Sequence, residues 1–315
     1  MDIPDLPKVT ILAIPMFITL IVIELTVSRW LARNSFETRD TAASLTMGIG
    51  NVITDMMFGF IGAGVLMWAS QLAIFDIGYS IPIVVACFLL DDLRFYWGHR
   101  ISHESRWFWS AHVTHHSSQH YNLSTALRQP WTGQFTGLIL LRVPLVVLGF
   151  HPVIVAFVGS INLVYQFWIH TEYIHKLPRP IEWIFNTPSH HRVHHATNPR
   201  YLDANYAGTL IIWDRLFGTF VPEQDDAPVR YGLVHNIGTF NPIRIALHEL
   251  VGIGQDVIRP GLTVVQRLGY VFGPPGWSHD GSRMTSAQIK SAAVERRPQL
   301  AGRPGLPTRS IGSGQ

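Results

Sequence analysis

Histidine spacing constrains this chain more than any other feature. The sequence from Gly98 to His116 reads GHRISHESRWFWSAHVTHH, and SHHRVHH follows at residues 189–195. Three sets have helical spacing: His99 and His103; His112, His115 and His116; and His191, His194 and His195. Residues three or four apart lie on one face of an α-helix. The pattern therefore predicts that imidazoles from three helical faces converge on one site.

A single straight helix could not present the first two sets to the same point. The nine-residue step from His103 to His112 would turn about 900° and place the two sets on opposite sides. We therefore expect the helix to bend between Glu104 and Ser110.

Composition points to a membrane protein. Of the 315 residues, 47% are hydrophobic and only 14% are charged, which is unusual for a soluble protein. The single cysteine, Cys87, excludes an internal disulfide, a four-cysteine iron–sulfur cluster and a thiolate zinc cage. The net charge of +3 is small and scattered, so no nucleic-acid partner is expected.

Several apolar segments have the length of membrane helices. A bilayer core requires about 20 apolar residues. Spans are expected at residues 9–28, 43–75 and 80–98, followed by a helical hairpin with arms at 132–149 and 152–169. Arg142 interrupts the first arm, which indicates a shallow or re-entrant segment. The predicted fold class is all-α: a polytopic membrane helix bundle with a cytoplasmic helical cap that carries a histidine-rich dimetal site.

The distribution of Lys and Arg predicts the orientation. Basic residues follow the first span, the third span and the hairpin, whereas the connections near Phe75 and Phe150 have none. By the positive-inside rule, the histidine sets face the cytoplasm and the N-terminus lies outside. The protein would be multi-pass, in the inner membrane if bacterial and in the endoplasmic reticulum if eukaryotic.

The histidines suit a metal that accepts neutral nitrogen, namely iron, zinc, copper or nickel. Eight imidazoles are too many for one ion, but two ions with about four nitrogens each and an open position fit the count. A purely structural zinc pair and a metal-free cluster are the alternatives. His170 ends the hairpin beside the other sets, and His190 adjoins His191. The candidate ligands are His99, His103, His112, His115, His116, His170, His190, His191, His194 and His195. Whether His120 or His175 joins them is left open.

Polar residues near the histidines are candidates for catalytic or orienting roles. A ligating histidine usually donates its second N–H to a carboxylate or a carbonyl. Glu104 follows His103 directly, and Asp203, Asn205 and Asp214 follow the last histidine set. The alternative for each is an ordinary solvated polar residue.

Longer motifs resemble a known family. They are HRxxHE and HxxHHSS in the first two sets, YNLSTALRQ at 121–129, NTPSHHRVHH at 186–195 and NYAGTLIIWDRLFGTF at 205–220. Over residues 45–277 the chain is similar to the fatty acid hydroxylase/sterol desaturase superfamily. The resemblance implies a membrane di-iron enzyme that uses O2 to oxidise a lipid. It also implies that the eight histidines of the three sets bind two Fe ions.

The expected activity is hydroxylation of a lipid C–H bond, with alkyl glycerol ether lipids as candidate substrates. The alternatives are a sterol or fatty-acyl desaturase and, more distantly, a histidine-rich metal transporter. We find no Gly-rich nucleotide motif and no haem-binding domain in the sequence. Electrons must then come from an external donor, for which the resemblance implies tetrahydrobiopterin and an electron-transfer protein is the alternative.

The domain organisation is predicted in three parts. Residues 1–42 form an N-terminal membrane span and loop, and residues 43–281 form the fatty acid hydroxylase-like membrane and cap domain. Residues 282–315 are rich in Gly, Pro, Ser and Arg. This tail has little to bury, and disorder is expected for it.

Overall fold

The computed structural model describes residues 6–33 and 35–301, and within these residues it is helical without strands. The predicted all-α class is therefore confirmed for this part of the chain. The α-helices are α1 (Val9–Trp30), α2 (Thr38–Ser70), α3 (Ile81–Glu104), α4 (Arg106–His116), α5 (Val143–Leu148), α6 (Pro152–Trp168), α7 (Arg179–Ile184), α8 (Pro188–His194), α9 (Ile212–Phe217), α10 (Pro242–Val257), α11 (Val264–Phe272) and α12 (Ser286–Ala301). Three 3₁₀ turns are η1 (Leu123–Leu127), η2 (Gly133–Phe135) and η3 (Leu138–Arg142).

Two of the described helices, α1 and α2, are long and apolar enough to cross a membrane. Both leave large apolar side chains exposed, such as Leu12 on α1 and Met56 on α2. Exposed apolar faces of this kind suit contact with lipid chains rather than water. α3, expected as a third span, is not among these candidates, and Asp91 and Asp92 lie in its middle.

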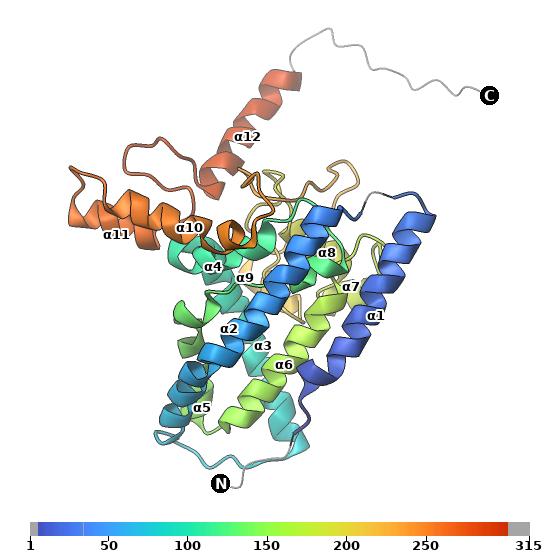
Figure 1. Cartoon of the computed structure of the whole chain (residues 1–315), viewed down its shortest axis with the longest axis vertical. Helices are drawn as coiled ribbons and strands as arrows, with labels where there is room; N and C mark the ends of the chain where they lie inside the picture. The colour runs from blue at the N-terminus through green and yellow to red at the C-terminus, as the bar shows by residue number, and fades with distance from the viewer. Residues whose placement is uncertain (1–5, 34, 302–315) are drawn as a thin grey trace.

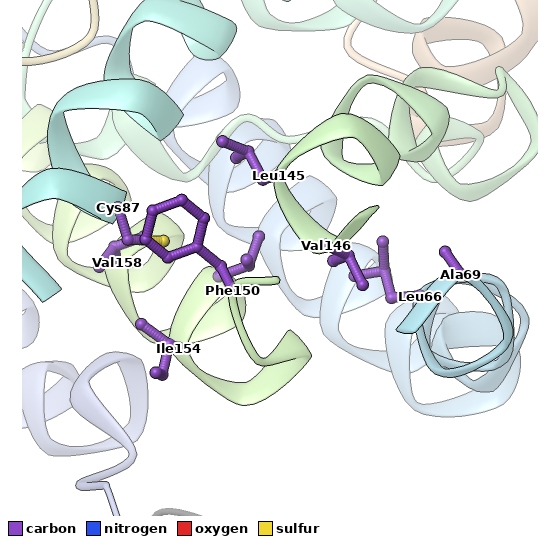
Figure 2. Packing of buried hydrophobic residues seen from close by; sticks show 9 residues of the cluster. Leu66, Ala69, Cys87, Leu145, Val146, Phe150, Ile154 and Val158 are labelled. Atoms are coloured by element: carbon purple, nitrogen blue, oxygen red, sulfur yellow. The ribbon is translucent and has the colours of Figure 1, made fainter. Parts of the chain in front are cut away.

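The long helices form one bundle, with the short cap helices at one of its ends (Figure 1). α6 packs against α1, α2 and α3. A buried apolar cluster joins α2, α3, α5 and α6 at the other end of the bundle (Figure 2). The side chains drawn include Leu66, Ala69, Cys87, Leu145, Val146, Phe150, Ile154 and Val158. The free thiol of Cys87 is thus part of the core.

The predicted hairpin is only half correct. Its second arm is α6, but the first arm consists of η2, η3 and the six-residue α5. Gly137 has a φ of 87°, a left-handed conformation that interrupts a helix. In addition, Arg142 Nε lies 3.6 Å from Asp91 Oδ1 of α3. Because the backbone is irregular here, Arg142 reaches the buried Asp91, and the first arm does not continue as a membrane span.

The tail predicted at residues 282–315 contains a helix, α12, at residues 286–301. A local cap explains the start of this helix: Thr285 N–H donates to Gln288 Oε1 (2.8 Å), and Gln288 N–H donates to Thr285 Oγ1 (3.4 Å). Such reciprocal bonds satisfy the free N–H groups of a first turn. The rest of the predicted tail, residues 302–315, lies outside the described residues.

Buried ion pairs attach the cap to the first histidine segment. Arg106, the first residue of α4, contacts Glu249 (2.5 Å) and Asp256 (2.7 Å), both on α10. Asp256 also accepts two bonds from Arg283, at 2.6 and 2.8 Å. α10 and the segment before α12 are thereby fixed against α4.

Candidate metal centre

The predicted bend is present. α3 ends at Glu104, and Ser105 is extended (φ −126°, ψ 126°) before α4 begins at Arg106. Because of this single extended residue, α3 and α4 can both present their histidines to the same interior space.

Nine histidines gather in two groups at the junction of α3, α4, α6 and α8. One group contains His99, His103, His112, His116 and His194, and the other contains His115, His170, His191 and His195. Within each group the candidate ligand atoms lie within 4.8 Å of one another. All but His112, which is half-buried, are buried. His170 joins the centre from the end of α6, as its position after the hairpin predicted.

The nitrogen geometry fits metal ligation. His99 and His112 approach Nε2 to Nε2 at 2.8 Å, and His170 Nε2 lies 3.1 Å from His115 and 3.0 Å from His191. Ligand nitrogens about 2.05 Å from a tetrahedral ion are separated by about 3.3 Å. In addition, His103 Nε2 and His194 Nε2 are buried without a hydrogen-bond partner in the described chain. Orphaned nitrogens and close Nε2 pairs are expected where a cation is the missing partner.

Burial favours the neutral form of His170, His191 and His194, which is the form that binds metal. It lowers the pKa of His170 to about 4. It also lowers the pKa of His191 and His194 well below the usual value, and neighbouring histidines add to the effect.

Backbone carbonyls orient several rings. His99 Nδ1 lies 2.7 Å from Tyr206 O, His194 Nδ1 lies 3.0 Å from Ala204 O, and His170 Nδ1 lies 2.8 Å from Gln166 O. A donor bond at Nδ1 directs Nε2 toward the centre. Carbonyl partners have no side-chain signature, so the sequence could not identify them.

Two acidic residues hold the loop that supplies two of these carbonyls. Asp214 accepts the backbone N–H groups of Tyr206 and Ala207, each at 2.8 Å. Asp92 accepts those of Thr209 (2.9 Å) and Leu210 (3.0 Å). The nearby Asp92 of α3 therefore acts through the loop and not as a ligand.

The three candidate catalytic residues have different surroundings in the structure. Asp203 Oδ1 lies 3.5 Å from His103 Nδ1, and Asp203 has a strained φ of 47°. Glu104 is exposed and pairs with Arg100 at 2.8 Å. Asn205 donates to the carbonyls of His190 (3.0 Å) and Val221 (2.8 Å), so its amide supports a loop. Of the three, only Asp203 contacts the side chain of a histidine in the two groups, and the catalytic roles of Glu104 and Asn205 stay predictions.

His190 was also expected as a ligand, but it lies outside both groups. Its Nε2 pairs with Glu182 Oε2 at 2.8 Å. Consecutive helical residues point about 100° apart, so His190 and His191 cannot both face the centre. His120 and His175 are likewise in neither group.

Two cavities reach the histidines and share no lining residue. The first, here called the cap-side cavity, has a volume of about 240 Å³ and touches His103, His116, His194 and His195. The second, the bundle-side cavity, has a volume of about 170 Å³ and touches His99, His112, His115 and His191. Each cavity therefore contacts both histidine groups.

Comparisons with known proteins agree with this site. Residues 84–219 match the family model described as fatty acid hydroxylase. The alkylglycerol monooxygenase of Xenopus tropicalis is 36% identical over 305 residues, which are 96% of this chain and 65% of that protein. The alkylglycerol monooxygenase of Danio rerio is 43% identical over 93% of this chain and 66% of its own length. The ornithine lipid hydroxylase OlsE of Rhizobium tropici is 28% identical over 44% of this chain and 41% of its own length.

The chain spans about two thirds of the length of the alkylglycerol monooxygenases that it matches. No solved structure matches it. Its apolar helices and these relatives together indicate association with a membrane.

Proposed function

We propose that this chain is a membrane-bound monooxygenase which hydroxylates a lipid C–H bond with O2. The match of residues 84–219 to the fatty acid hydroxylase family model supports this proposal. The observation that carries the proposal is the double group of nine histidines reached by two cavities. Two iron ions, when bound by these groups, would supply the reduction of O2 and the oxidation of the C–H bond.

The protein contributes ligands, orientation and exclusion of water. His99, His103, His112, His116 and His194 would hold one ion, and His115, His170, His191 and His195 would hold the other. Carbonyls of the 204–206 segment fix the rings of His194 and His99. Asp203, beside His103, would hold that ring in its orientation.

The substrate that we propose is an alkyl glycerol. Relatives with 36% and 43% identity are alkylglycerol monooxygenases, and the bundle-side cavity is lined in part by Phe95, Leu138 and Leu163. Hydroxylation at the carbon beside the ether oxygen gives a hemiacetal, which collapses to a fatty aldehyde and glycerol. The electrons would come from tetrahydrobiopterin or from an external electron-transfer protein.

We further propose a cytoplasmic location for the metal centre, in a multi-pass membrane protein. The basic residues after α1 and at the junction of α3 and α4 support this orientation. In a metal transporter, ligands would recur along the membrane helices. Here the two histidine groups come from the C-terminal end of α3, from α4, from α8 and from the residues after α6.

The product distinguishes the candidate reactions. Membranes containing the protein should release fatty aldehyde from an alkyl glycerol when supplied with tetrahydrobiopterin and ¹⁸O2, and the aldehyde should carry label when exchange with water is controlled. His194→Ala membranes are the matched control and should release none. If ether lipids give no aldehyde but a supplied sterol or acyl lipid gains a double bond, the chain is a desaturase.

A further inference from the structure

The two cavities divide the surroundings of the candidate metal centre. Each is lined by four of the nine histidines, and no residue belongs to both. The histidine cluster therefore separates them, and two different molecules could reach it at the same time.

The walls of the cavities differ in origin. The bundle-side cavity is formed in part by α3, by η3 and by Leu163 and Gln166 of α6, close to the apolar helices. The cap-side cavity is formed by α4, by α10, by residues 232–235 and by the start of α12. A lipid chain arriving from the membrane would meet the first cavity, whereas a water-soluble molecule would meet the second.

The lining of the cap-side cavity suits a small planar molecule with N–H groups. Trp109 lies with its ring centroid 5.1 Å from that of His103 and 5.5 Å from that of His116, so it offers an aromatic face beside the candidate ligands. Asp203 and Glu249 add carboxylate acceptors. His248 Nδ1 lies 3.0 Å from the carbonyl of Ile245, which leaves Nε2 as a further acceptor.

The size and the exposure of this cavity support the same class of ligand. A volume of about 240 Å³ lies just below the usual range of ligand pockets, about 300–1,000 Å³, and suits a small ligand. Val234 and His235 line the cavity and are exposed, so the cavity communicates with solvent. A ligand could enter and leave there without crossing the membrane.

We infer that the cap-side cavity is the binding site of a small, planar, heterocyclic two-electron donor, separate from the lipid site. The assignment rests on the proposed monooxygenase function, because the stoichiometry of that reaction requires a two-electron donor. One O2 oxidises one C–H bond to C–OH, and its second oxygen atom leaves as water. The donor gives up two electrons and two protons and is released in its oxidised form.

Reciprocal variants test this assignment by binding as well as by turnover. Leu233→Trp fills the cap-side cavity, and Leu163→Trp, at a half-exposed position on α6, fills the bundle-side cavity. The probes are biopterin, an unreactive oxidised heterocycle followed by its fluorescence, and a photoactivatable alkyl glycerol. We expect Leu233→Trp to weaken biopterin binding at least about tenfold and to leave lipid crosslinking unchanged. Leu163→Trp should have the opposite effect.

A second variant guards against misfolding. His248→Leu preserves the size of the side chain but removes the acceptor, and it should weaken biopterin binding while metal content stays at the unmodified level. Biopterin affinity that is unchanged in both Leu233→Trp and His248→Leu would overturn the assignment. A different result is that the protein binds biopterin, loses that binding in the two variants, and oxidises no lipid. This result would support the assignment and overturn the proposed reaction.

Discussion

Neighbouring residues His190 and His191 offer a direct test of the ligand set. His191 Nε2 lies 3.0 Å from His170 and 3.2 Å from His195, whereas His190 pairs with Glu182. We expect His191→Ala to lose about one metal ion per chain and all activity. His190→Ala should keep its metal because it removes no ligand. Elemental analysis of purified protein measures both, and equal losses from the two variants would show that the ligand set is misassigned.

Asp203 tests the role of a residue that orients a ligand. Its carboxylate lies 3.5 Å from His103 Nδ1, and loss of such a partner typically costs about 10- to 100-fold in metal affinity. Asp203→Asn should therefore weaken metal binding by that factor in competition with a chelator. Glu104→Ala is the matched control, because Glu104 is exposed and paired with Arg100. If the metal affinity of Asp203→Asn is unchanged, Asp203 does not orient the His103 ring.

Side-chain spacing predicted which histidines come together better than it predicted the groups that orient them. The i,i+3 and i,i+4 sets appear in the two groups because helical geometry follows from sequence separation alone. The carbonyls of Ala204 and Tyr206 could not be predicted, since any residue type supplies a carbonyl. Arg192, between His191 and His194, binds Glu223 through two bonds at 2.8 and 2.9 Å.

At the scale of the helices, α10 carries a buried ionic network. Asp256 is 1% exposed and contacts Arg106, Arg259 and Arg283 at 2.6–2.7 Å. Removal of one partner from a buried ionic network costs about 3–5 kcal/mol. Asp256→Ala should lower the free energy of unfolding by that amount, measured by denaturant unfolding in detergent.

A surface pair provides the control for this prediction. Asp226 is exposed and lies 3.4 Å from the exposed Arg200, and pairs of this kind contribute about 0–1 kcal/mol. Asp226→Ala should therefore have little effect. If both variants unfold alike, the cap is not held to α4 by the ionic network.

Element boundaries were predictable where one physical effect dominates. Long, mostly apolar stretches predicted α1, α2 and α6. The segment from 132 to 142 is apolar as well, but the glycines and the pairing of Arg142 with Asp91 favour 3₁₀ turns. This pairing joins residues 51 positions apart, so no local pattern could indicate it.

For the molecule as a whole, the length of α2 allows a direct test of the orientation in the membrane. α2 has 33 residues and a length of about 50 Å, enough to separate its two ends by a bilayer. Asp76, beyond one end of α2, and His175, in the cap region, are both exposed. The basic loops predict that Asp76 lies outside the cell and His175 inside.

Cysteine labelling in intact cells tests this orientation in a Cys87→Ala background, which removes the one native thiol. A membrane-impermeant maleimide should label Asp76→Cys in intact cells, whereas it should label His175→Cys only after permeabilisation. Labelling of His175→Cys alone from outside would invert the orientation and place the histidines on the external side. Labelling of both would mean that α2 does not cross the membrane. In either case the electron donor would have to be supplied from outside the cell, because the cap-side cavity lies on the same side as the cap.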